Sequence, residues 1–147
     1  GPTVYNYPHI GNMRPVVVFD VLRRFFEYVG YEVTYVSNFT DVDDKIIKAA
    51  KEQEKTEKEL TEFYISEFKK TVELIGSKLP NITPKVTEYI QKIIDYIDRL
   101  VKLDAAYVVD GDVYFRVSKI KDYGALSGIN TDDLIAGARV EENSKKE

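Results

Sequence analysis

The sequence predicts an α/β fold whose first part is a parallel strand–helix–strand–helix unit. Stretches rich in β-forming residues occupy 1–8 and 31–39, and a pattern of apolar residues at helical spacing follows each of them. Strands that alternate with helices usually join one parallel sheet through helical crossovers. The apolar content of 44% is sufficient for a buried core.

Turn residues bound the first strand and the first helix. Pro8 ends the strand-like stretch, and apolar residues then recur at spacings of three and four over 11–29. Pro15 is expected in the first turn of this helix, where its missing N–H is harmless. Gly30 is placed to end the helix.

The second strand, 31–39, is predicted to lead into a shorter helix. Thr40 is its expected N-cap, with Asp43 at the third helical position and the helix continuing to Ala50. The acidic cluster of Asp41, Asp43 and Asp44 suggests a magnesium site. Carboxylates at a helix start are more often caps and dipole partners, and we favour that interpretation.

Two amphipathic helices are predicted in the middle of the chain. Thr56 is placed to cap the first, which covers 57–75. A loop is expected at 76–84 because glycine and proline residues gather there. The second helix covers 86–101.

A hairpin is predicted over 106–117, with Asp110-Gly111 at its turn. A loop is expected at 118–128, and Thr131 is placed to cap one further helical turn. Four phenylalanines fall at the apolar spacing of predicted helices and are expected in the core: Phe19, Phe25, Phe63 and Phe68.

Composition excludes several classes of protein. The net charge of −4 gives no argument for nucleic-acid binding, although 21 Lys and Arg residues leave room for a local basic face. Cysteine is absent, so the chain has neither a disulfide framework nor a thiolate metal site. No apolar run approaches the roughly 18 residues of a membrane span. We expect a soluble, cytoplasmic, monomeric protein that does not enter a membrane.

The two ends of the sequence look like those of an excised piece. The chain begins with Gly1-Pro2-Thr3 and no methionine, and it ends in a charged run of the kind found in loops. We therefore expect a segment of a longer protein.

The motif His9-Ile10-Gly11-Asn12 lies where the first strand enters the first helix, and it contains the only histidine. A helix N-terminus offers free N–H groups and positive partial charge to a phosphate. His9 and Asn12 add side-chain donors, Gly11 lets a flat ring approach the backbone, and Arg14 adds a guanidinium. The alternative is a proline–glycine turn with an ordinary surface histidine, and the four residues alone leave both interpretations open.

The sequence also resembles the N-terminal catalytic region of bacterial cysteinyl-tRNA synthetases. The similarity runs through nearly the whole chain and is weakest over 50–105. It is carried by the GPTVY stretch at 1–5, the HIGH-type signature at 9–12, SNFTDVDDKI at 37–46, DGDVYF at 110–115, YGALSG at 123–128 and AGARV at 136–140.

The resemblance implies a partial Rossmann-like, class I synthetase nucleotide-binding half. Residues 1–50 would be the first part of the catalytic domain, with the signature. Residues 51–147 would be the helical, hairpin-containing connective-peptide insertion and the start of the return to the catalytic domain. Such enzymes activate cysteine with ATP, which enters with magnesium, and transfer the cysteinyl group to tRNA(Cys).

The resemblance also implies roles for site residues. His9 and Asn12 would be catalytic and stabilise the ATP phosphates, while Ile10 and Gly11 would complete the ATP site. Gly1 and Thr3 would face the amino-acid pocket. The family binds zinc, whose ligands fall outside this sequence, so we expect no metal site in this chain and no activity from it alone.

Two other functions remain open at this point. A paralogue would transfer cysteine from the same adenylate to the amine of a sugar-type acceptor. A nucleotide-binding or RNA-binding module without catalysis would use the same motif for binding alone.

Overall fold

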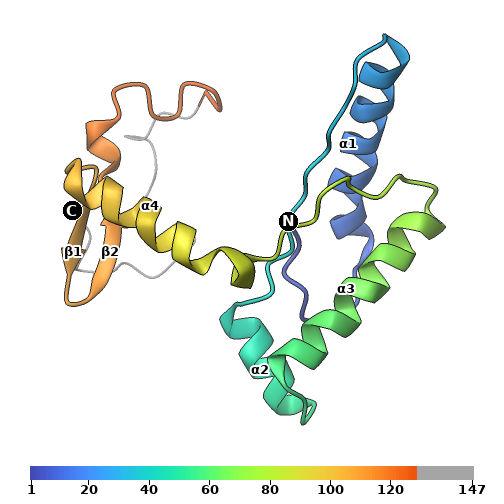
Figure 1. Cartoon of the computed structure of the whole chain (residues 1–147), viewed down its shortest axis with the longest axis horizontal. Helices are drawn as coiled ribbons and strands as arrows, with labels where there is room; N and C mark the ends of the chain where they lie inside the picture. The colour runs from blue at the N-terminus through green and yellow to red at the C-terminus, as the bar shows by residue number, and fades with distance from the viewer. Residues whose placement is uncertain (129–147) are drawn as a thin grey trace. The chain divides into compact units, whose positions relative to one another are not determined.

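A computed structural model describes residues 1–128 of the chain. The chain forms two compact units, Gly1–Ile90 and Gln91–Glu147, and each is described by itself. The first unit holds the signature, the helices α1, α2 and α3, and the extended segments between them (Figure 1). The predicted boundary at residue 50 between a catalytic part and an insertion stays a prediction.

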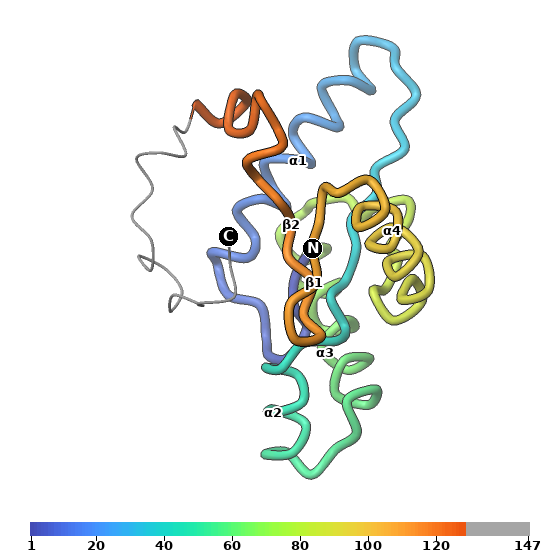
Figure 2. The backbone as a smooth tube through the Cα atoms, turned by 90° about the vertical axis from the view of Figure 1, so that its left-hand side faces the viewer, coloured from blue at the N-terminus to red at the C-terminus, as the bar shows by residue number. Residues whose placement is uncertain are grey.

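Three extended segments of the first unit run parallel to one another. The central segment, 35–40, pairs with 2–4 through the bridge Thr3–Thr40, and with 81–86 through the bridges Val36–Ile82 and Phe39–Lys85. Figures 1 and 2 show the chain returning from the end of α1 along this path to the start of α2. The predicted parallel order of 1–8 and 31–39 is therefore confirmed.

The predicted strands are wrong in one respect, because the segments meet only in isolated bridges and form no continuous strand. Prolines supply the physical reason, since a proline donates no hydrogen bond to a ladder. Pro2 begins the first segment and Pro8 follows it, while Pro80 precedes the third segment and Pro84 interrupts it. The third segment lies mostly in the stretch expected to be a loop.

Helix α1 spans Ile10–Tyr28 and confirms the predicted helix to within one residue at each end. The position predicted for Pro15 is wrong, because it is the sixth helical residue and therefore lies in the second turn. Its missing N–H would have paired with the Gly11 carbonyl in a regular helix. Gly30, with φ of 94°, follows the helix as predicted.

Helices α2 (Asp44–Glu52) and α3 (Glu57–Leu74) form an antiparallel hairpin (Figure 1). The predicted cap of α2 is wrong. Asp43 is the N-cap and accepts a hydrogen bond from the Lys45 N–H at 2.9 Å, whereas the Thr40 backbone is engaged with the first segment. The predicted cap of α3 is confirmed.

The α3 cap is a reciprocal pair of hydrogen bonds. The Glu59 N–H donates to Thr56 Oγ1 at 3.2 Å, and the Thr56 N–H donates to Glu59 Oε2 at 3.0 Å. The Thr56 hydroxyl also donates to Glu59 Oε2 at 2.8 Å. The bond from the Thr56 N–H, together with this one, holds the pKa of the Glu59 carboxyl below its ordinary value.

The core of the first unit joins α2 and α3 to two of the extended segments. Its buried members are Val4, Phe39, Ile46, Ala49, Ala50, Leu60, Tyr64 and Ile65, with Tyr5 and Phe68 packed against them. Burial of these side chains is the main favourable term that holds the segments on the helices.

The predicted burial of aromatic residues is confirmed only for Phe68. Its ring packs edge-on against Phe39, with ring centroids 5.6 Å apart. Phe19, Phe25 and Phe63 are 48%, 56% and 42% exposed, so their predicted place in the core is wrong. Each of the three still has an aromatic neighbour: Tyr35 beside Phe19, Phe26 beside Phe25, and Tyr7 beside Phe63.

The second unit contains helix α4 and a hairpin. Helix α4 spans Ile90–Lys102 and follows a 3₁₀ turn at Val86–Tyr89, so the helix predicted from residue 86 begins in tighter form. Strands β1 (Ala106–Val109) and β2 (Asp112–Phe115) pair antiparallel and confirm the hairpin.

Both turn residues of the hairpin have positive φ, 51° at Asp110 and 86° at Gly111, as a two-residue type I′ turn requires. A short 3₁₀ turn at Val117–Lys119 interrupts the loop expected at 118–128. The turn predicted at Thr131 and the motif at 136–140 lie outside the described residues. None of the helices found in residues 1–128 combines the length and apolarity needed to cross a membrane.

Candidate nucleotide-binding site at the start of helix α1

His9 is the N-cap of α1. Its backbone is extended, with φ −107° and ψ 171°, and its Nδ1 accepts a hydrogen bond from the Gly11 N–H at 3.1 Å. A neutral imidazole that accepts at Nδ1 carries its proton on Nε2. His9 is exposed, so this Nε2–H is a donor at the positive end of the helix.

Asn12 completes the cap from the other side. The His9 N–H donates to Asn12 Oδ1 at 2.9 Å, and the Asn12 N–H donates to the His9 carbonyl oxygen at 2.8 Å. The orientation of the amide follows, because an Oδ1 that accepts leaves the Nδ2 group to donate. His9 and Asn12 are thus hydrogen-bonded to each other, and His9 offers its Nε2–H and Asn12 the two N–H groups of Nδ2 as further donors.

Gly11 leaves room for the imidazole of His9. A Cβ built on Gly11 would lie 2.8 Å from His9 Cε1 and 3.0 Å from Nδ1, closer than real side chains approach. The predicted reason for this glycine was space for a nucleotide. In the structure the neighbouring ring already uses that space, so any larger residue would displace His9 from its cap.

One cavity brings together three of the predicted site residues. Thr3, His9 and Asn12 line a cavity of about 110 Å³. Its other walls are the loop from Pro2 to Pro8 and two rings of α3, Tyr64 and Phe68.

A neighbouring cleft of about 290 Å³ contains Gly1, Gly11 and Asn12. Gly1 lies so close to the central segment that a Cβ there would meet Asn38 O at 2.0 Å. Glycine is therefore required at this approach. Asn12 lines both cavities and joins the predicted nucleotide and amino-acid residues.

Two candidates lie apart from both cavities. The side chain of Ile10 is 86% exposed and that of Arg14 is exposed, and neither lines the cavity or the cleft. The Ile10 backbone still belongs to the first turn, so its peptide groups remain part of the helix N-terminus.

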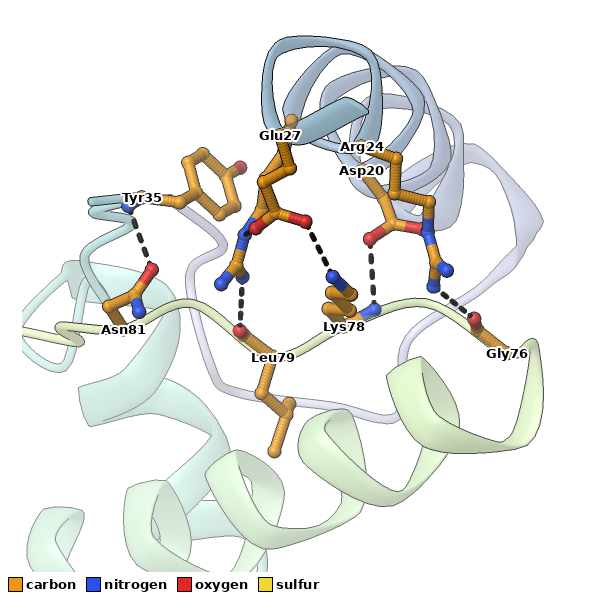
Figure 3. Close-up of polar contacts among 9 residues, drawn as sticks. Asp20, Arg24, Glu27, Tyr35, Gly76, Lys78, Leu79 and Asn81 are labelled. Carbon is orange, nitrogen blue, oxygen red and sulfur yellow. Dashed lines mark hydrogen bonds and ion pairs between the residues drawn. The ribbon is translucent and has the colours of Figure 1, made fainter. Parts of the chain in front are cut away.

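A set of polar contacts, here called the polar clamp, ties α1 to residues 76–79 (Figure 3). Asp20 accepts from the Lys78 backbone N–H at 3.0 Å, and Arg24 donates to the Gly76 carbonyl at 3.0 Å. On the same face Arg23 donates to the Leu79 carbonyl at 2.9 Å, and Glu27 pairs with the Lys78 ammonium at 2.5 Å. The clamp fixes α1 against the stretch that directly precedes the third extended segment.

The clamp lowers the pKa of two carboxyl groups. Burial raises the pKa of Asp20, but the hydrogen bonds from Arg24 and from the Lys78 N–H outweigh it and bring the pKa below its ordinary value. Hydrogen bonds from Lys78 and then Arg23 lower the pKa of Glu27. Both carboxylates are therefore stabilised in their charged form.

The aspartates of the acidic cluster are engaged separately. Asp43 caps α2, Asp44 lies in its first turn, and buried Asp41 accepts from the Thr87 N–H at 3.0 Å and from Thr87 Oγ1 at 2.5 Å. The capping interpretation is confirmed for Asp43.

The described residues do not fit a zinc site. Within 1–128, no group of three or more His, Cys, Asp or Glu side chains is arranged to hold a metal ion. The chain contains no cysteine and one histidine, whereas zinc sites use such ligands.

The sequence did not single out Tyr7, Tyr64 and Phe68 as residues of the site. Tyr64 and Phe68 were assigned only to the apolar face of a helix, which their spacing of four does indicate. That spacing carries no information on which distant loop the face meets. Tyr7 carried no signal beyond the alternation of its strand-like stretch.

Comparison with known proteins gives a consistent result. The family model for the tRNA synthetases class I (C) catalytic domain matches residues 1–147. The chain is 52% identical to the cysteine–tRNA ligase of Fervidobacterium nodosum over 147 residues, which is 99% of the chain and 31% of that protein. It is 54% identical over 138 residues to that of Lactococcus lactis subsp. cremoris, covering 94% of the chain and 31% of that protein.

A third relative, the cysteine–tRNA ligase of Caldicellulosiruptor saccharolyticus, is 52% identical over 147 residues, covering 100% of the chain and 32% of that protein. The chain thus spans about a third of the length of the curated relatives that it matches.

Proposed function

This chain belongs to the family of tRNA synthetases class I (C) catalytic domains, and from this premise we propose that it is the signature-bearing part of a cysteine–tRNA ligase. The complete polypeptide that carries the chain is called the parent ligase below. It activates cysteine with ATP to cysteinyl adenylate and pyrophosphate, then transfers the cysteinyl group to tRNA(Cys). The relatives described above, each a cysteine–tRNA ligase by name, support this substrate.

The observation that carries the proposal is the position of His9. Its Nε2–H lies at the N-terminus of a helix of 19 residues, beside the cavity that Thr3 and Asn12 also line. Negative charge moves among the phosphate oxygens when the adenylate forms. Donors held in place before the reaction stabilise that charge without reorganisation.

The residues divide between the two small substrates. His9 and the Nδ2 group of Asn12 donate to the ATP phosphates, and the first turn at Ile10 and Gly11 adds the helix N-terminus. Gly1 and Thr3 line the amino-acid side of the site. The two sides meet at Asn12, which lines both the cavity and the cleft.

The zinc ligands of the parent ligase are assigned to residues outside this chain, since the chain has no cysteine and one histidine. No step described here depends on that metal. Monomeric state and cytoplasmic location stay predictions.

The test is cysteine-dependent exchange of pyrophosphate into ATP by the parent ligase, followed by charging of tRNA(Cys). We expect exchange with cysteine and not with serine, because a ligase of this kind must reject the hydroxyl analogue. The 147-residue chain alone should stay at background.

Three results would contradict the proposal in different ways. Exchange with an amino acid other than cysteine would assign another substrate. Exchange without tRNA charging, but with transfer to an amino sugar, would identify the paralogue. Binding of ATP without pyrophosphate exchange would indicate a nucleotide-binding module that has no catalytic activity.

A further inference from the structure

The ring of Tyr7 contacts helix α3. Its centroid lies 5.3 Å from that of Tyr64 and 6.0 Å from that of Phe63, with interplanar angles of 84° and 82°. Phe63 and Tyr64 are themselves edge to face at 5.1 Å. Edge-to-face geometry is the favoured arrangement for aromatic pairs, so these rings form a directional contact.

On the α3 side of this contact, Tyr64 is packed into the core. Tyr64 is 6% exposed and belongs to the core with Leu60 and Ile46, both of which are fully buried. Close-packed interiors transmit displacement instead of absorbing it. Tyr7 therefore contacts a side chain that is anchored in the core, although 58% of Tyr7 itself is exposed.

The link from Tyr7 to His9 is short and stiff. One residue, Pro8, separates them, so their Cα atoms are at most about 7 Å apart. The proline ring fixes its own φ, and it restricts Tyr7, the residue before it, to extended conformations. The backbone of His9 is also extended, and α1 begins at the next residue.

We propose that Tyr7 is a positioning residue, which sets the placement of the His9 imidazole by anchoring the signature loop to α3. The kinetic half of this proposal rests on the proposed function. The structural half does not, because it concerns only where the ring of His9 lies.

The structural half is tested in the 147-residue chain, whose single histidine gives one set of imidazole signals in nuclear magnetic resonance. Tyr7→Ala should shift the His9 ring signals and weaken the preference for the Nε2–H tautomer. Tyr7→Phe keeps the ring and should restore the wild-type signals. Tyr28→Ala is the control, because Tyr28 lies at the far end of α1 and is 89% exposed.

The kinetic half is tested in the parent ligase by pyrophosphate exchange. Tyr7→Ala should lower kcat about two- to tenfold, the factor that corresponds to one aromatic pair, with little change in the KM for ATP. Tyr7→Phe should recover kcat. A loss confined to kcat indicates a misplaced transition-state donor, since weaker binding alone would raise KM.

Unchanged His9 signals in a folded Tyr7→Ala chain would overturn the proposal, whatever the kinetics. If Tyr7→Ala fails to fold, Phe63→Ala decides instead. It removes one of the two α3 partners at a position that is 42% exposed, and it should shift the same His9 signals. A wild-type parent ligase without exchange would sink the proposed function, and the His9 signals would still decide the role of Tyr7.

Discussion

Asp20 accepts a hydrogen bond from the backbone N–H of Lys78 at 3.0 Å, although the end of α1, the central extended segment, α2 and α3 lie between them in the sequence. Asp20 is 7% exposed, and Arg24 satisfies its second oxygen at 2.8 Å. A buried carboxylate satisfied in this way holds α1 against Lys78, just before the third extended segment. The orientation of the site therefore depends on a contact outside it.

Asp20→Ala is expected to lower the free energy of unfolding of the chain by about 1–3 kcal/mol, because the Lys78 N–H and the Arg24 guanidinium lose their acceptor. Urea unfolding followed by circular dichroism measures it. Asp98→Ala is the matched control, since its i,i+4 pair with Lys102 is exposed and should contribute less than about 1 kcal/mol. Equal losses of unfolding free energy in the two variants would show that the Asp20 contacts stabilise the chain no more than an exposed ion pair does.

The clamp also predicts a dependence on pH. The pKa of Asp20 is lowered in the folded chain, so its contribution is present above the unfolded value near 3.8 and is lost as pH falls through the folded value. The gap in unfolding free energy between wild type and Asp20→Asn should narrow below about pH 4. Unfolding curves at a series of pH values measure this gap. A gap that widens on acidification would contradict the lowered pKa.

His9→Ala in the parent ligase should lower the rate of adenylation about a hundred- to a thousandfold, with a smaller effect on ATP binding. The same change removes a cap and should cost about 1 kcal/mol of stability. His9→Asn separates the two roles, because asparagine is a good N-cap and has no imidazole Nε2–H. Exchange kinetics and melting on both variants measure the two effects. A well-folded His9→Asn enzyme with near-normal turnover would end the assignment of His9 to catalysis.

Gly11→Ala adds a Cβ in contact with the imidazole. We expect the His9 ring to rotate off its cap, the His9 signals to move, and exchange by the parent ligase to fall. Gly30→Ala tests the opposite case. A Cβ added at this position would have no heavy atom within 4 Å, so the only cost is the φ of 94°, which alanine rarely adopts. Gly30→Ala should lower stability and leave the His9 signals unchanged. If Gly11→Ala, like Gly30→Ala, lowers stability and leaves the His9 signals unchanged, Gly11 contributes only to the stability of α1.

Local signals in the sequence predicted local structure well. The α3 cap joins Thr56 to Glu59 across three residues, and the hairpin turn needs only Asp110 and Gly111 with positive φ. Each is settled by neighbours in the chain, so each can be predicted from a short window. The same holds for α1 and its end at Gly30.

Non-local contacts explain what the sequence did not predict. The segment 81–86 was expected to be mostly loop because Pro84 and the preceding Pro80 indicate one. No short window of sequence contains its pairing with 35–39. Nothing in the sequence around Asp20 distinguishes a buried carboxylate of the polar clamp from an exposed carboxylate. His9 was predicted as a ligand donor, whereas its role as the cap of its own helix depends on a ring orientation that sequence does not encode.

The parallel bridges have a consequence for the order of folding. The α2–α3 hairpin and the β1–β2 hairpin each join neighbours in the chain, so they close small loops and form early. The bridges Thr3–Thr40 and Phe39–Lys85 join distant residues, and contacts of high sequence separation form slowly. The loop that delivers His9 is anchored by the first of these bridges. We therefore expect the loop that carries His9 to reach its native geometry late in folding, after the α2–α3 hairpin has packed.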